Sequence, residues 1–198
     1  IQSKNITEDK NIFAAAKRGI WNGNAAKELR KILNSLKKEE TIVHVHNWSN
    51  VFSSSIVKML LDLDFKTVIT LHDYLIVCPN GGFYDYKHKK ICTYEPMSMK
   101  CIFCNCDRRS YPQKLYRVAR EIVQNRYIRN NEKLNFITIS NFNDSLIRPR
   151  IRSKKIHRVN NFVQIETTKD FERNESKTYI CVGRVVEEKG IEVFCRAI

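Results

Sequence analysis

The sequence lacks any apolar stretch long enough to cross a membrane. No run approaches the roughly 20 apolar residues that a transmembrane helix needs. It also has no apolar segment typical of an export signal, no internal repeat and no low-complexity tract. These absences exclude a membrane span and a repeat architecture within these residues. With 42% hydrophobic residues over 198 positions, the chain has enough apolar material for a packed core.

Acidic residues are scarce relative to basic ones. Lys and Arg total 35 against 21 Asp and Glu, which gives a net charge of +14. This excess predicts an acidic partner, which could be nucleic acid, anionic lipid headgroups or a phosphorylated substrate. Residues 148–158 are strongly basic, contain no acid and have few aromatics, which disfavours stacking of single-stranded nucleic acid there. A solvated basic loop and attraction to an anionic membrane surface both remain open.

Seven cysteines without a secretory segment favour reduced thiols or a metal over a disulfide scaffold. Five of them lie within 29 positions of one another. Cys101 and Cys104 have the C-x-x-C spacing of a zinc knuckle, and Cys92 with Cys78 or Cys106 would complete four ligands. The predicted zinc is structural, because no His and Glu set that activates water accompanies the cysteines. Free thiols and a disulfide are the two alternatives.

Alternating apolar patterns predict an α/β domain with a parallel sheet in residues 1–163. Short apolar runs indicate strands, and apolar residues at helical spacing indicate the helices between them. Asn24 is the expected N-cap of the first helix. The expected strands are residues 42–45, 67–71, 136–139 and 156–159, and the expected helices cover residues 24–36, 56–63 and the segment from Pro112 onward.

The helix that begins near Pro112 carries a long apolar stripe. Its members recur at helical spacing, which predicts one apolar face packed in the core rather than a functional surface. The stripe consists of Leu115, Val118, Ala119, Ile122 and Val123.

Polar residues follow each expected strand. Because the carboxyl ends of parallel strands meet at one edge of a sheet, these residues are predicted to share one rim. His72 is predicted to lie nearest the chemistry, since a strand-end imidazole can hydrogen-bond a sugar or a departing phosphate. A histidine satisfied by backbone groups is the alternative. The other rim residues are His46, Asn47, Asp73, Ser140 and Asn160, with His44 inside its strand predicted to be structural.

Either His46 or Asn47 could simply cap the next helix. Asp73 could orient His72 or cap the following turn, and it is not expected to act as a general base.

Residues 164–177 are polar and without periodicity, which predicts a linker between domains. After it, Thr178–Val182 is an apolar run suited to a buried strand, and Gly183 lets the backbone approach a ligand. Arg184 and Lys189 supply a forked donor and a point charge, and the helical pattern beginning at Gly190 adds N-terminal N–H groups. Residues 178–198 therefore predict a diphosphate clamp that opens a second domain. Two solvated cations in a surface loop are the alternative.

Five blocks, in chain order, resemble motifs of the retaining glycosyltransferases of family 4. The second block is similar to that of a subset acting on polysaccharides and cell envelopes. Thr41 stands where the first motif usually has an acid. The blocks are residues 41–47 (TIVHVHN), 70–80 (TLHDYLIVCPN), 139–141 (ISN), 161–163 (NFV) and 183–190 (GRVVEEKG).

The resemblance implies a GT-B fold, in which two Rossmann-like domains face a cleft. The N-terminal domain takes the acceptor, and the C-terminal domain binds the nucleotide sugar through Gly183, Arg184 and Lys189. Two expected features are missing from this sequence, the first strand with its glycine-rich loop and a downstream E-x7-E motif. The chain is therefore expected to hold most of the first domain and only the first βα unit of the second, which leaves the activity of these residues by themselves in question.

The implied activity is a retaining, hexosyltransferase-like transfer from a nucleotide diphosphate sugar to a glycan or lipid-linked acceptor of the envelope or of an exopolysaccharide. His72, Arg184 and Lys189 would carry it without a catalytic cofactor, at the cytoplasmic side of a membrane. Two alternatives are a basic α/β module that binds nucleic acid or an anionic polymer, and a transferase remnant without activity. The sparse aromatics of the basic segment disfavour nucleic acid.

Overall fold

The computed structural model describes residues 12–162, 178–183, 185–186 and 189–198. The chain divides into two units, Ile1–Asn161 and Phe162–Ile198, which are treated separately below. The predicted linker at residues 164–177 and the clamp residue Arg184 lie outside the described residues.

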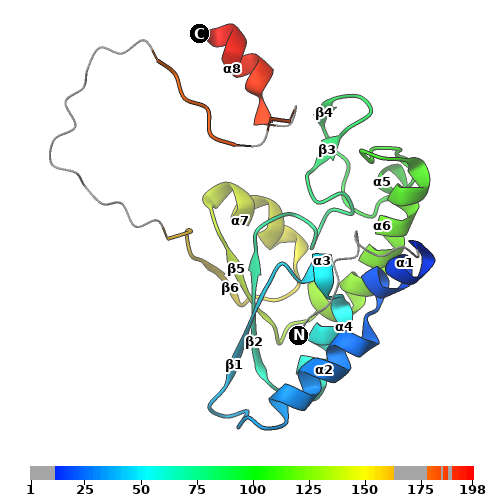
Figure 1. Ribbon diagram of the computed structural model, residues 1–198, viewed down its shortest axis with the longest axis vertical. Helices are drawn as coiled ribbons and strands as arrows, with labels where there is room; N and C mark the ends of the chain where they lie inside the picture. Colours follow the sequence, from blue (N-terminus) through cyan, green and yellow to red (C-terminus); the bar gives the residue numbers. More distant parts are fainter. Residues whose placement is uncertain (1–11, 163–177, 184, 187–188) are drawn as a thin grey trace, which may run out of the picture. The chain divides into compact units, whose positions relative to one another are not determined.

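Four parallel strands form the sheet of the first unit (Figure 1). Their spatial order is β1-β2-β5-β6, and each neighbouring pair is parallel. This confirms the predicted α/β class with a parallel sheet. The strands are β1 (Ile42–His46), β2 (Lys66–Leu71), β5 (Asn135–Thr138) and β6 (Ile156–Arg158).

One face of this sheet builds the core. Val45, Ile69 and Phe136 lie side by side on neighbouring strands and are at most 6% exposed. Helices α2 (Gly23–Leu33) and α4 (Ser54–Asp62) and the π-helix η2 (Asn125–Arg129) contribute apolar residues to the same cluster. The opposite face is more open, since Ile42 at its edge is 65% exposed. Strand-alternating side chains therefore separate a buried face from an accessible one.

Helices connect and cover the strands as the apolar spacing predicts, with one correction at a helix start. The N-cap of α2 is Asn22 and not Asn24, because the Asn22 Oδ1 accepts the Ala25 N–H at 3.1 Å and the Asn22 N–H donates to Ser53 Oγ at 2.7 Å. The helices of this part are α1 (Ile12–Ile20), α2 (Gly23–Leu33), α3 (Trp48–Val51), α4 (Ser54–Asp62), α6 (Tyr111–Gln124) and α7 (Asn141–Ile147).

Helix α6 forms as predicted, but its mainly polar face points into the protein and part of its apolar stripe points outward. Leu115 and Ile122 are 44% and 59% exposed, so the prediction that the stripe lies in the core is wrong for these two residues. Val118 is the stripe member that is buried. The inward face consists mainly of polar side chains, and two of these, Lys114 and Gln124, make hydrogen bonds to groups outside the helix. The buried residues of α6 are Lys114, Val118, Glu121 and Gln124.

A long insertion after β2 carries the clustered cysteines. It contains the antiparallel hairpin β3–β4 (Tyr84–Asp85 and Lys90–Ile91) and the short helix α5 (Met99–Phe103). The π-helix η2 (Asn125–Arg129) follows α6, and the 3₁₀ helix η3 (Arg148–Arg150) follows α7.

The second unit contains the helix α8 (Ile191–Ala197), which follows Gly190 as predicted. The predicted strand Thr178–Val182 is not present, and Tyr179, Ile180 and Val182 are 64–92% exposed. A strand needs a neighbour to satisfy its backbone N–H and C=O groups. Within the described residues of this unit no such neighbour exists, so the buried-strand prediction is wrong here.

Candidate functional site at the carboxyl edge of the sheet

Two histidines meet where β1 and β2 end. His46 is the last residue of β1, and His72 follows β2 directly. The His46 Nδ1 and the His72 Nε2 lie 2.9 Å apart, and their ring centroids are 5.3 Å apart. Both residues are exposed. The structure therefore brings these two predicted rim residues together as a solvent-facing pair in which an N–H of one ring donates a hydrogen bond to the ring nitrogen of the other.

His44 extends this pair along the same strand face. Residues two apart in a strand point to the same side, so the His44 and His46 rings contact each other with their centroids 4.1 Å apart and their planes tilted by 46°. The His44 Nε2 also bonds the Thr70 Oγ1 at 2.7 Å. Burial, together with repulsion from His44 and His72, lowers the pKa of His46 below its ordinary value. His44 was predicted to be structural, although its period-two spacing from His46 was a signal that the two share a face.

Asp73 lies in the turn that follows His72. Its Oδ1 accepts the Leu75 N–H at 2.9 Å, which is the turn-capping alternative. The residue stays exposed, yet desolvation by surrounding protein raises the pKa of its carboxyl, while the Leu75 N–H, Arg120 and His72 act in the opposite direction.

The remaining rim residues divide between structural and accessible roles. The Ser140 Oγ caps α7 by accepting the Asn143 N–H at 3.1 Å. Asn47 is exposed and has a left-handed φ of 45°, and its side chain makes no capping bond to α3. Asn160, which follows β6, is exposed. Asn47 is thus better placed than Ser140 to meet a ligand.

The clamp in the second unit is described only in part. Lys189 is exposed, and its backbone N–H donates to the Val186 carbonyl at 3.0 Å. Gly190 has φ +68°, a left-handed conformation that glycine adopts without strain, and it precedes α8. Gly183 is also exposed. Arg184 lies outside the described part of the chain, so the structure gives no distance between Arg184 and Lys189. The clamp stays a prediction.

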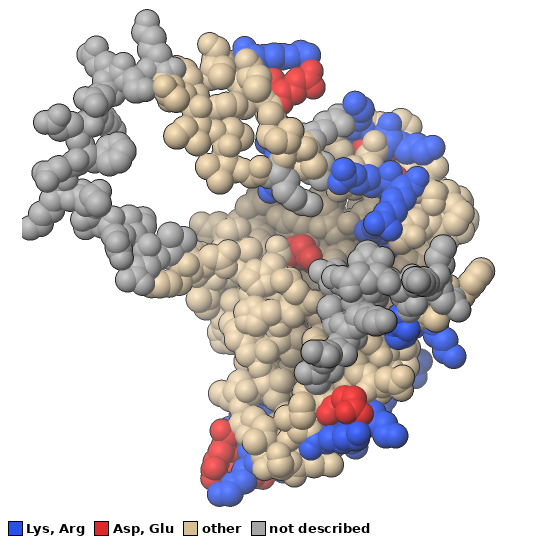
Figure 2. Space-filling model, viewed as in Figure 1, with Lys and Arg blue, Asp and Glu red and all other residues tan. Residues whose placement is uncertain are grey.

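The basic segment at residues 148–158 is more neutralised than its composition suggests. The Arg148 guanidinium pairs with Asp144, that of Arg150 with Glu95, and that of Arg152 with Glu132, at 2.6–2.9 Å. On the face shown in Figure 2, most acidic residues lie beside basic ones, while several Lys and Arg have no acid next to them. This segment is therefore a poor candidate for a continuous polyanion-binding groove.

The cysteines of the insertion gather around a buried lysine. The Lys114 Nζ lies 3.7 Å from the Cys101 Sγ, and Lys114 is 1% exposed. The Cys104 Sγ lies 3.8 Å from the Asp85 Oδ2, and the Asn80 Nδ2 donates to the Cys106 Sγ at 3.1 Å. All seven cysteines are free thiols.

Burial keeps several of these thiols protonated. It raises the pKa of Cys106 to about 12 and also raises the pKa values of Cys92 and Cys104. In the part of the chain that the structure describes, no three His, Cys, Asp or Glu side chains are placed to hold a metal ion. A zinc ion on Cys78, Cys92, Cys101 and Cys104 would need these thiols to lose protons and converge.

Zinc content tests the structural-metal prediction directly. The hypothesis predicts about one zinc per purified chain, lost when Cys101 and Cys104 are both changed to serine. The matched control changes the two exposed cysteines of the second unit, Cys181 and Cys195, and should leave the zinc in place. Metal-free protein in which the thiols react under native conditions would leave the cluster as a set of free thiols around Lys114.

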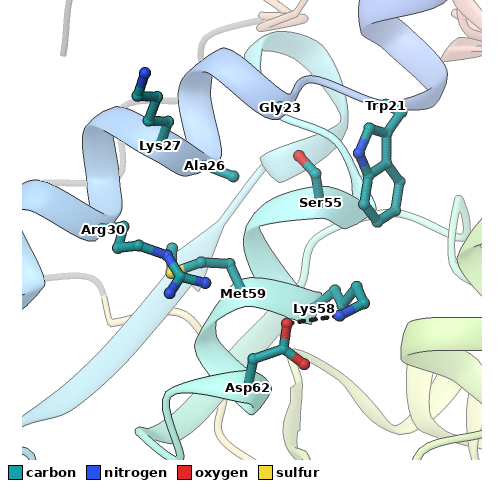
Figure 3. Close-up of a pocket in the computed structure, with 9 residues that line it drawn as sticks. All are labelled: Trp21, Gly23, Ala26, Lys27, Arg30, Ser55, Lys58, Met59 and Asp62. Carbon is teal, nitrogen blue, oxygen red and sulfur yellow. Dashed lines mark hydrogen bonds and ion pairs between the residues drawn. The ribbon is translucent and has the colours of Figure 1, made fainter.

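Two hollows in the described residues lie away from the histidine pair. One, of about 300 Å³, lies between α2 and α4 and is flanked by Trp21, Arg30 and Lys58 (Figure 3). The Lys58 Nζ is bound to the Asp62 carboxylate at 2.6 Å. A second, of about 440 Å³, lies beside Trp21 and Tyr127. Neither contains a residue of the predicted rim.

Comparisons with known proteins add no relative. No family model, no curated protein and no solved structure matches this chain. Among the described residues, none of the helices has both the length and the apolar character that crossing a membrane requires.

Proposed function

We propose that this chain is part of a retaining glycosyltransferase that moves a sugar from a nucleotide diphosphate sugar to a glycan or lipid-linked acceptor. One observation carries the proposal. Two of the five blocks that resemble family 4 motifs, residues 41–47 and 70–80, span the carboxyl ends of β1 and β2. A third, residues 139–141, directly follows β5, and a fourth begins at Asn161, shortly after β6 ends at Arg158. In open parallel α/β sheets this edge is where ligands bind.

The histidine pair supplies the chemistry expected on that edge. In this proposal His72 donates a hydrogen bond to the sugar or to the departing phosphate, and His46 holds the orientation of the His72 ring through their 2.9 Å contact. The depressed pKa of His46 keeps it neutral at pH 7, so it can accept or donate that bond without adding charge. Arg184 and Lys189 would stabilise the diphosphate as negative charge grows on it.

The test is sugar transfer by the protein that carries both domains. His72→Ala should lower turnover by about 10- to 100-fold, because a hydrogen bond to a group that gains charge is worth roughly 1.5–3 kcal/mol. His157→Ala is the matched control, since His157 is an exposed histidine two strands away on the same sheet. Release of nucleoside diphosphate and formation of the glycoside are measured together.

Equal turnover in the His72→Ala variant, the control and the parent would remove the strand-end histidine from the mechanism. The binding-module alternative predicts a different result altogether. It requires association with polyanions that weakens steeply with salt and is unaffected by nucleoside diphosphates. The three ion pairs in residues 148–158 make it the weaker of the two proposals.

A further inference from the structure

The outward face of α6 joins α1 to form an exposed apolar surface. Ile122 and Val123 of α6 line the same hollow as Ile20 and Trp21, at and just beyond the end of α1. Ile122 is 59% exposed and Trp21 is 38% exposed. Phe13 lies two helical turns from Ile20 on the same side of α1 and is 88% exposed.

We call this the α1–α6 surface. It is defined by Phe13, Ile20, Trp21, Leu115, Ile122 and Val123.

Its charged neighbours have one sign. Helix α1 contains Lys17 and Arg18 and no acid. In α6 and η2 the only acid is Glu121, which is fully buried, whereas Arg126 is exposed beside the hollow. The surface therefore combines apolar side chains with accessible cations and has no accessible carboxylate on these three elements.

Aromatic side chains complete the pattern. The Trp21 and Tyr127 rings pack with their centroids 5.3 Å apart, and the Arg126 guanidinium lies 5.8 Å from the centre of the Tyr127 ring. Trp and Tyr have an apolar ring and a polar group, which suits them to the headgroup level of a bilayer. Apolar helix faces bordered by Lys and Arg bind anionic membranes in the interfacial plane.

We infer that the α1–α6 surface docks on an anionic phospholipid bilayer. Nucleic acid would use the cations but leave the aliphatic side chains of Leu115 and Ile122 in water, and a bilayer satisfies both. The inference goes beyond the proposed sugar transfer and does not depend on it, because it rests on exposure and charge in α1, α6 and η2. It also places the membrane contact away from residues 148–158, for which the sequence left attraction to an anionic membrane as one of two alternatives.

The experiment is co-sedimentation of the whole chain with vesicles of phosphatidylcholine alone or with a quarter phosphatidylglycerol. Binding should be strong only with the anionic lipid and should weaken as salt is raised. Replacing both Leu115 and Ile122 by serine should lower the partition coefficient about 10-fold or more, since each change removes apolar area that the bilayer would bury. Lys17→Gln should lower it about five-fold, as expected for one juxtamembrane cation.

Ile42→Ser and Arg152→Gln are the matched controls. Ile42 is an exposed apolar residue on β1, and Arg152 is an exposed cation that pairs with Glu132. Both should bind vesicles like the parent, and thermal melts should show every variant folded. Two results would overturn the inference. One is an absence of vesicle binding by the parent protein. The other is that the Leu115 and Ile122 changes act only by weakening oligonucleotide binding or self-association of the chain.

Discussion

Glu121→Gln is expected to remove a pH dependence of stability that the parent protein shows between about pH 4.5 and pH 7. Glu121 is fully buried, and this burial raises the pKa of its carboxyl from 4.5 to about 7. Its Oε2 accepts a bond from the Gln124 Nε2 at 2.9 Å, while its Oε1 has no hydrogen-bond partner. A carboxylate in that position is costly, so the folded state holds the proton more tightly than the unfolded state does.

The sign follows from proton linkage. Between the unfolded and the folded pKa, the folded protein binds more protons, so the free energy of unfolding falls as pH rises. A shift from 4.5 to about 7 corresponds to roughly 3 kcal/mol lost across that window. Glutamine has no proton to lose, and the variant should therefore gain on the parent by that amount between pH 4.5 and pH 8.

Urea unfolding at several pH values measures this difference. Glu39→Gln is the matched control, because Glu39 is exposed, and its profile should run parallel to that of the parent. The comparison uses the change with pH rather than the stability at one pH, since a buried amide has its own cost. A Glu121→Gln profile that stays parallel to the parent across the window would mean that Glu121 titrates near its ordinary pKa in the folded protein.

Arg184→Ala is expected to slow sugar transfer by about 10²- to 10³-fold in the protein that carries both domains. Removing one donor from a developing negative charge costs roughly 2.7–4 kcal/mol in the barrier. Binding of the nucleoside diphosphate should weaken less than turnover falls, because charge on the leaving group grows toward the transition state. Lys189→Ala should act in the same direction but less severely, since a point charge loses less geometry than a fork.

Arg196→Ala is the control for the clamp. Arg196 is an exposed arginine of α8 that pairs with Glu192, so its loss should leave turnover unchanged. Calorimetric titration of uridine or guanosine diphosphate, alongside turnover, separates binding from catalysis. Parental affinity and rate in both the Arg184 and the Lys189 variants would make residues 183–190 an ordinary surface loop.

Local pattern predicted the strands and the place where they end. Apolar runs bounded by polar residues identified β1, β2, β5 and β6 to within about a residue, because the buried face of a strand requires that composition. The meeting of His46 with His72 followed from parallel pairing alone. The capping role of Asp73 was one of two alternatives that the sequence left open.

Long-range partners decided the features that the pattern missed. The N-cap moved to Asn22 because Ser53, 31 positions away, accepts its N–H. In the basic segment, Arg150 and Arg152 pair with Glu95 and Glu132, which lie 55 and 20 positions away in the chain. Contacts between residues so far apart in the chain cannot be predicted from local sequence patterns, since the residues around either partner do not depend on the contact.

The sequence by itself determined the α/β class, the positions of β1, β2, β5 and β6 and the amphipathic character of α6. Only the tertiary structure decided which face of α6 points inward. Amphipathicity shows that a helix has an apolar and a polar face, but it does not show which groups of the rest of the protein the helix packs against. Here the Gln124 side chain donates to the Leu75 carbonyl, and the Lys114 Nζ contacts the Cys101 Sγ of the cysteine cluster. The polar face is thus satisfied inside, and Leu115 and Ile122 are left at the surface.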